Sequence, residues 1–406
     1  MSGNVPAIRF VGFTEPWEQC KLGELMDVAS VRRVHQEDWT DEGVRFLRAR
    51  DLVAFAKNEP VDEPLFISEE MYQEYSAQSG KVSMGDLLVT GVGTIGVPWL
   101  VTSENPIYFK DGNIIWFKNA GEIDGEFFYH SFTASTIQSF INEAAGIGTV
   151  GTFTIETGKK TPIWLPTKQE QRCVSAFMTR LDNLITLHQR KHDQLATLKK
   201  SLLEKMFPKP GSDVPELRFA EFTEPWEQRK LGDIAHRITR KNEGESDLPL
   251  TISAQYGLVD QRTFFNNQVA SKDMSGYYLL RKGEFAYNKS TSGDSPWGAV
   301  KRLEKYEKGC VSTLYICFGL DDADPNFLVT YYETDRWYKT VQVIAAEGAR
   351  NHGLLNIAPD DFFDTVLKLP SSREEQERIG AFFARLDSLI TLHQRKHDQL
   401  ATLKKS

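Results

Sequence analysis

The chain is short of the features that mark secreted and membrane-bound proteins. It has four cysteines among 406 residues, without paired spacing, which argues against a disulfide framework and favours reduced thiols in the cytoplasm. No apolar run approaches the roughly 20 residues of a membrane span, and the opening residues lack the basic and apolar segments of a signal peptide. We therefore expect a cytoplasmic protein without a membrane partner.

The chain also lacks an excess of positive charge, because 48 Lys and Arg residues stand against 56 Asp and Glu residues. The formal net charge is −8, which by itself argues against a nucleic-acid partner because phosphates attract Lys and Arg. The charge is uneven, however: segments 168–209 and 371–406 are net basic, and the rest of the chain is acidic. A DNA-binding function would therefore need locally basic faces on an acidic protein.

Convincing catalytic motifs are absent. Residues 105–108 (Asn-Pro-Ile-Tyr) lack the second proline of the adenine methyltransferase loop, and no glycine-rich cofactor turn precedes them. His188 and His192 lie one helical turn apart, as do His393 and His397, a spacing that can hold a metal. The cations between them favour a polar helix layer or a partner contact instead. We expect no catalytic residue and no metal or cofactor bound by this chain.

What the chain does have is an internal repeat. Residues 181–201 and 386–406 differ only at Asn183/Ser388, and residues 9–22 closely match 218–231. The stretches between these matched ends hardly resemble each other. We call the matched ends the frames and the stretches between them the inserts. Two near-identical frames around two different inserts indicate a protein that makes two different recognition contacts.

The repeated segments predict long helices. Thr167 and Ser372 each stand three residues before a glutamate, Glu170 and Glu375, which is the pattern of a capping box. The first helix should run over about 167–206 and be roughly 60 Å long. The predicted helix-pairing leucines follow a narrow heptad seam: Leu181, Leu184, Leu195, Leu198, Leu386, Leu389, Leu400 and Leu403. The alternative is that each helix packs only on its own insert.

The inserts show mixed helical and strand patterns, with Gly- and hydroxyl-rich loops after strands. Arg, Lys and Asn read base edges, and hydroxyls and backbone N–H groups hold phosphates. The candidate DNA-binding residues are Arg48, Arg50, Gly93 and Thr94 in the first insert, and Tyr287, Asn288, Lys289, Ser290, Arg350 and Asn351 in the second. Arg48 and Arg50 are expected on one face of a strand. The alternative is that these are ordinary polar loops.

This layout resembles the specificity subunit of type I restriction–modification systems. The resemblance rests on the doubled Glu-Pro-Trp-Glu-Gln-x-Lys-Leu-Gly segment at 15–23 and 224–232, and on the doubled Ile-Thr-Leu-His-Gln-Arg-Lys helix. Segments 250–255 and 283–289 also look like a known target-recognition type. It implies an α+β fold with an internal pseudo-two-fold repeat, in which two target-recognition domains are separated by two long helices that form an antiparallel coiled coil.

The resemblance also implies a domain order and a set of partners. The first target-recognition domain would span 1–165, the central helical spacer 166–209, the second domain 210–370 and the C-terminal spacer 371–406. Each domain would read half of a bipartite, asymmetric site in double-stranded DNA. The partners would be two modification subunits, which use S-adenosylmethionine, and two restriction subunits, which use ATP and Mg²⁺. The alternatives are a coiled-coil protein adaptor without DNA readout and a self-sufficient methyltransferase or nuclease.

Overall fold

The computed structural model describes residues 6, 8–145, 151–253, 256–265, 271, 273–291, 295–345 and 353–405. The chain divides into two compact units. Unit 1 comprises Met1–Ile185 and Leu400–Ser406, and unit 2 comprises Thr186–Gln399. Among the described residues, no helix is both long enough and apolar enough to cross a membrane.

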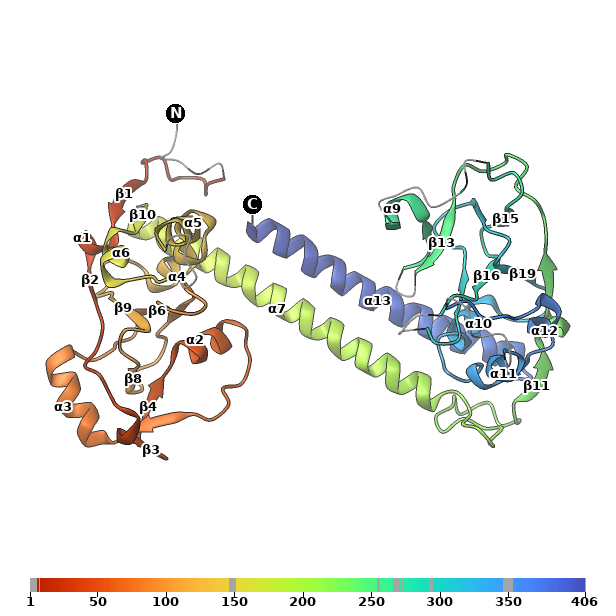
Figure 1. Ribbon diagram of the computed structural model, residues 1–406, viewed down its shortest axis with the longest axis horizontal. Coiled ribbons are helices and arrows are strands. Elements are labelled where there is room, and N and C mark those ends of the chain that lie inside the picture. Colours follow the sequence, from red (N-terminus) through yellow and green to blue (C-terminus); the bar gives the residue numbers. More distant parts are fainter. Residues whose placement is uncertain are drawn as a thin grey trace. The chain divides into compact units, whose positions relative to one another are not determined.

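The described residues of unit 1 form strands β1 to β10 and the first helices of the chain, and Figure 1 labels most of them. The strands are β1 (Glu18–Lys21), β2 (Asp27–Ala29), β3 (Trp39–Thr40), β4 (Val44–Leu47), β5 (Leu65–Ile67), β6 (Leu87–Thr90), β7 (Pro98–Leu100), β8 (Ile107–Phe109), β9 (Ile114–Lys118) and β10 (Pro162–Leu165). The helices are α1 (Leu22–Leu25), α2 (Ala49–Ala56), α3 (Glu69–Ser79), α4 (Gly125–Thr133), α5 (Ser135–Ala144), α6 (Ile155–Lys160) and the start of α7 (Lys168–Lys205), with a 3₁₀ turn at Gln36–Asp38.

Two four-stranded sheets build the core of unit 1. One has the order β2-β9-β6-β7 and the other β3-β5-β4-β8. Alternation along β6 places Leu87 and Val89 in a cluster with the aromatic residues of α4, and Leu88 in the cluster that includes the second sheet. The first sheet is therefore covered on both faces.

Unit 2 contains the remaining strands and helices. The strands are β11 (Glu227–Lys230), β12 (Ala235–Ile238), β13 (Leu250–Ser253), β14 (Gly257–Asp260), β15 (Tyr278–Arg281), β16 (Phe285–Asn288), β17 (Ala299–Arg302), β18 (Lys308–Val311), β19 (Ile316–Leu320) and β20 (Val366–Leu369). The helices are α8 (Leu231–Ile234), α9 (Gln261–Phe265), α10 (Pro325–Tyr331), α11 (Tyr338–Ile344), α12 (Pro359–Phe363) and α13 (Arg373–Lys405).

The two inserts share a sheet topology that their sequences do not reveal. The main sheet of unit 2 has the order β12-β19-β16-β17, which matches β2-β9-β6-β7 strand for strand. Each unit also has a two-stranded antiparallel pair made by the frame, β1 with β10 and β11 with β20. The α+β prediction, with an internal repeat, is confirmed.

An ion pair that occurs once in each unit explains why the frame sequence recurs. In unit 1, Arg9 donates from Nε and Nη2 to the two carboxylate oxygens of Glu170, each at 2.7 Å, and Trp17 Nε1 donates to Glu170 at 3.3 Å. The same bonds, at 2.7, 2.7 and 3.3 Å, recur in unit 2 between Arg218, Trp226 and Glu375. Both glutamates are fully buried. Each pair fastens the segment before an insert to the first turn of the long helix after it.

In each predicted capping box, the hydroxyl contact is therefore present and the carboxylate contact is not. Thr167 and Ser372 do cap their helices, because each hydroxyl accepts from the backbone N–H three residues later, at 3.4 Å. The carboxylates of Glu170 and Glu375 bind the distant arginine and tryptophan instead of the backbone at the cap. A charged guanidinium is a stronger partner for a buried carboxylate than a backbone N–H.

The neighbouring glutamine in each helix makes a second fastening. Gln171 accepts from the backbone N–H of Asp124 at 3.0 Å, and Asp124 in turn caps α4. Gln376 and Asp324 make the same bonds at the start of α10. The Glu-Gln pair of each frame thus positions both the chain segment before the insert and a helix that covers its sheet.

The long helices pair in antiparallel fashion within unit 2. His188 contacts His393, whereas Lys199, further along α7, contacts Asp387, which is earlier in α13. His188 and His393 are equivalent residues of the repeat, and their Nδ1 atoms lie 2.8 Å apart. One ring must donate and the other accept. Burial, then the nearby His393 and Lys396, lowers the pKa of His188.

At alternate positions of the seam, the residue that faces the partner helix lies one residue later in the chain than predicted. Leu198, Leu389 and Leu403 are 49%, 40% and 47% exposed, so they do not form the seam. Leu181 and Leu386 are buried, whereas Leu184, Leu195 and Leu400 are half-buried. The half-buried positions that alternate with Leu181 and Leu195 are Ile185, His192 and Lys199.

Polar partners make this register possible. Lys199 Nζ lies 2.5 Å from Asp387 and 2.6 Å from Glu333. Burial lowers the pKa of Lys199, but the two carboxylates raise it by more, so it lies above its ordinary value. The equivalent residues Lys404 and Asp182 make the same bond within unit 1, at 2.5 Å. Because Lys199 and Lys404 are polar, a pattern of apolar residues does not indicate these positions.

Candidate nucleic-acid interface

The glycine-rich segment of the first insert forms a tight turn after β6. Gly96 donates its backbone N–H to Thr90 O at 2.8 Å, and the Thr90 hydroxyl bonds to Thr94 O at 2.5 Å. Gly93 has φ +71°, a left-handed conformation that side chains with a Cβ rarely adopt. Gly93 and Thr94 are exposed at the tip of this turn. Their role in DNA binding stays a prediction.

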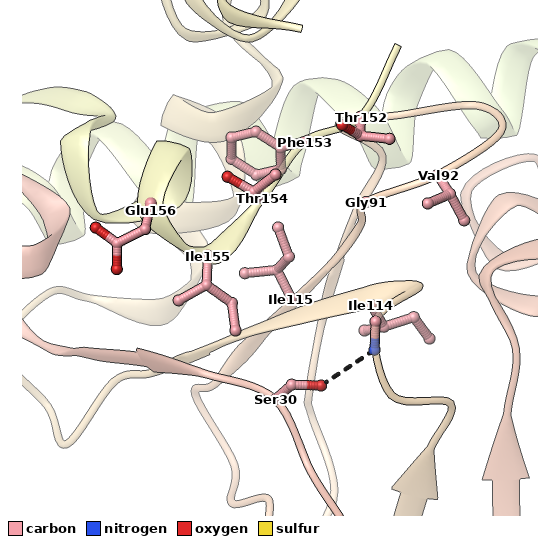
Figure 2. A pocket seen from close by; sticks show the side chains of 11 residues that line it. Ser30, Gly91, Val92, Ile114, Ile115, Thr152, Phe153, Thr154, Ile155 and Glu156 are labelled. Carbon is pink, nitrogen blue, oxygen red and sulfur yellow. Dashed lines mark hydrogen bonds between the residues drawn. The ribbon is translucent and has the colours of Figure 1, made fainter. Parts of the chain in front are cut away.

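Neighbouring segments hold the base of the turn and enclose a pocket of about 430 Å³. Gly91 donates to Asn113 O at 2.8 Å and accepts from Phe153 N at 2.9 Å. Figure 2 shows Ile114 and Ile115 on one side of this pocket, with residues 152–156 on another. The lining is mainly apolar, so it suits the support of a loop better than the binding of a phosphate.

A second, more polar pocket adjoins the first at Gly112. It measures about 400 Å³ and is lined by segments 33–36 and 110–113 together with Trp39. Its charged and amide-bearing lining residues are Arg33, His35, Gln36, Lys110, Asp111 and Asn113. These are residue types that contact base edges and phosphates.

The loop after β16 in unit 2 corresponds to the turn after β6 in unit 1. Lys289 O accepts from the backbone N–H of Leu355 at 3.0 Å, just as Gly91 O accepts from Phe153 N. Thr291 donates its backbone N–H and its hydroxyl to Gly353 O at 2.6 and 3.0 Å. Both units thus present a loop at the same strand end, held by the segment that follows the α5 or α11 region.

Arg48 and Arg50 do not share a strand face. β4 ends at Leu47 and α2 begins at Ala49, so the two arginines stand on either side of a strand–helix junction. Arg48 Nη2 bonds to the buried Asp51 at 3.2 Å and to Glu63 O at 2.9 Å. Arg50 Nη2 donates to Asp62 O at 3.2 Å, although its side chain is half exposed. Arg48 is therefore occupied with bracing α2, which corrects the expectation that it faces DNA.

Tyr287 is a core residue. It is fully buried, stacks on Phe362 with ring centroids 4.5 Å apart, and donates its hydroxyl to Trp297 O at 2.8 Å. Burial raises its pKa. A side chain with this packing is not available to DNA, so its assignment to the interface is wrong. The period of two along β16 was the relevant signal, because Tyr287 lies on the same face as Phe285.

The other candidates of the second insert lie at or beyond the end of β16. Asn288 Oδ1 accepts from Ser290 N at 3.0 Å, and Ser290 is exposed. Lys289 Nζ donates to Ile357 O at 3.2 Å, and burial lowers its pKa. These three residues remain candidate DNA contacts. Arg350 and Asn351 lie outside the described residues.

Among the residues that the structure describes, no group of three or more His, Cys, Asp or Glu side chains could hold a metal ion.

The polar pocket of unit 1 is the feature that the sequence did not reveal. Its two segments are about 75 residues apart in the chain, and neither has a periodic pattern. The adjacent arginines at 32–33 were the available signal.

Comparison with known proteins agrees with this geometry. Residues 14–197 match the family model of the type I restriction modification DNA specificity domain. A putative type I restriction enzyme specificity subunit of Haemophilus influenzae is 29% identical over 120 residues, which are 29% of this chain and 30% of that protein. The match therefore spans less than a third of the relative's length.

One solved structure shares the fold over the whole length of the chain. The crystal structure of a type I restriction–modification S subunit from M. genitalium covers 100% of this chain and 97% of its own, with a TM-score of 0.53 and 13% identity. The HsdS subunit from Thermoanaerobacter tengcongensis covers 96% of this chain and 94% of its own, with a TM-score of 0.44 and 16% identity. With two repeated frames, two inserts of one topology and a match over residues 14–197 to the type I restriction modification DNA specificity domain, the chain is similar to the specificity subunits of type I restriction–modification systems and shares the fold of one of them.

Proposed function

We propose that this chain reads a bipartite, asymmetric site in double-stranded DNA, with one half-site for each unit. The observation that carries the proposal is the repetition of one sheet order, β2-β9-β6-β7 and β12-β19-β16-β17, with a loop at the same strand end. The loops differ in sequence although the frames around them are nearly identical. Two sheets of the same topology that carry loops of different sequence are suited to the recognition of two different base sequences.

The long helices act as a spacer in this proposal. α7 has 38 residues, which corresponds to about 57 Å at 1.5 Å per residue. Two readers on one side of a duplex need a separation of about one helical turn, roughly 34 Å. A helix of this length is sufficient to set such a separation, and the DNA between the half-sites would remain unread.

The assembly partners are part of the same proposal. Two modification subunits would bind the chain and methylate adenine with S-adenosylmethionine, and two restriction subunits would supply ATP- and Mg²⁺-dependent translocation and cleavage. The ion pair between Arg9 and Glu170 recurs between Arg218 and Glu375. This repetition of the frame supports two equivalent docking surfaces for the two modification subunits. In this division of labour the chain supplies recognition, and its partners supply the chemistry.

Selection from a random duplex library, with the modification subunit present, tests this function. We expect two short defined segments separated by a spacer of fixed length, with affinity that falls as salt rises. A library recovered without any sequence preference would contradict the proposal and would favour a protein adaptor.

A further inference from the structure

The polar pocket of unit 1 contains an arginine whose guanidinium is held at one end and open at the other. Arg33 Nε donates to Asp111 Oδ2 at 3.0 Å. The side chain of Arg33 is 68% exposed, whereas that of Asp111 is 17% exposed. Among the described residues, Nε makes the hydrogen bond of this guanidinium, which leaves both terminal amino groups available to a ligand.

Nearby arginines of unit 1 are engaged differently. Arg32 lies 4.0 Å from the ring centroid of Tyr75 and bonds to Glu74 at 3.1 Å. Arg45 donates to Leu65 O at 3.0 Å, and Arg48 bonds to Asp51 and Glu63. Arg33 thus differs from these neighbours, because its bond to the protein is made by Nε and its side chain is 68% exposed.

The segment that carries Asp111 is fixed by the fold. Lys110 donates its backbone N–H to Leu47 O at 2.9 Å, and Gly112 donates to Ser30 Oγ at 3.4 Å. Gly112 has φ +68°, and Asn113 O accepts from Gly91 at 2.8 Å. These bonds tie the segment to β4, to the end of β2 and to the turn after β6. The carboxylate that accepts from Arg33 Nε is therefore carried by a segment that the fold holds in place.

We propose that Arg33 reads a guanine in the half-site of unit 1, with Asp111 as its positioning residue. The inference rests on the proposed function. Guanine presents two acceptors, O6 and N7, in the major groove, and a guanidinium can donate to both. Asp111 binds Nε and leaves the terminal amino groups to make this pair.

The carboxylate also favours a base over a phosphate. A phosphate is drawn to net positive charge, and Asp111 offsets the charge of Arg33 at 3.0 Å. The donor geometry of the guanidinium is unchanged, so a neutral edge with two acceptors is still bound. Lys110 and Gln36, both exposed at the same pocket, flank the site and can contact the neighbouring backbone or bases.

The test is a random-duplex selection with the full chain and its modification subunit, comparing wild type with Arg33→Ala. We expect the variant to lose preference for guanine at one position in one half-site by about 5- to 150-fold, with the other half-site unchanged. Arg32→Ala is the matched control and should leave the selected sequence as in the wild type. Asp111→Asn should weaken the guanine preference and steepen the salt dependence, because it restores net positive charge.

Two results would overturn the inference. One is an unchanged preference at every position in Arg33→Ala. The other is a uniform loss for all sequences with a salt slope reduced by about one, which identifies a phosphate contact. Should Arg33→Ala fail to fold, Arg33→Gln, which keeps a long polar side chain, is judged by the same criteria. Failure of the proposed function is distinguished by the wild type, which would then select no sequence at all.

Discussion

Replacing Arg218 with Met should destabilise unit 2 strongly. The carboxylate of Glu375 is fully buried and accepts two bonds of 2.7 Å from Arg218. Without the arginine, it keeps only the 3.3 Å bond from Trp226. Breaking a buried ion pair on one side costs about 3–5 kcal/mol, because the remaining charge is unpaired and cut off from water.

The magnitude can be measured by calorimetry. Unit 2 spans about 200 residues, and for this size 1 kcal/mol shifts Tm by about 2–4 °C, so the expected decrease is about 6–20 °C. The double variant Arg218→Met/Glu375→Leu removes both charges and should recover most of the loss. Arg9→Met is the matched variant of unit 1, where the same bonds occur. A decrease below about 1 kcal/mol for the single variant, or a double variant as unstable as the single one, would refute the reasoning.

Three further predictions concern unit 2. Leu195→Ser should cost on the order of 1–2 kcal/mol in urea denaturation because Leu195 packs on the core, whereas the exposed Leu198→Ser should be near neutral; equal costs would contradict the corrected register. The free energy of unfolding should fall as the pH drops below about 6.5, because the pKa of His188 is lowered in the folded chain and the unfolded chain therefore binds more protons. His188→Gln should reduce the slope of the unfolding free energy against pH. An unchanged slope would exclude the His188–His393 pair as its source. Tyr287→Phe should leave DNA selectivity unchanged while lowering Tm, because it removes only the buried bond to Trp297. A change in the bases selected in one half-site would show that Tyr287 contributes to DNA recognition after all.

The repeat and its helices could be predicted because their signals are local. Identical segments, helix caps and uninterrupted helical patterns all lie within short windows of sequence. The error in register arose because leucines were given more weight than His192 and Lys199, whose burial depends on partners such as Asp387. A carboxylate more than 180 residues away cannot be inferred from the pattern around a lysine.

The position of the candidate loops could be predicted from the sequence, whereas the surroundings of their side chains could not. Loops after β6 and β16 do occupy equivalent strand ends. Arg48 and Tyr287 were selected for their chemistry, yet the fold uses one to brace α2 and the other to fill the core. Arg33 and Asp111 were missed because 78 residues separate them in the chain and only the tertiary fold brings them together.

The central claim is that each unit reads its own half-site. It is tested most directly by replacing residues 232–364 with residues 23–160. The junctions are equivalent, because Leu22 N bonds to Thr161 O at 3.0 Å and Leu231 N bonds to Thr365 O at 2.9 Å. Selection from a random duplex library with the modification subunit should then yield two half-sites with the same bases. Persistence of the original second half-site in this variant would contradict the account.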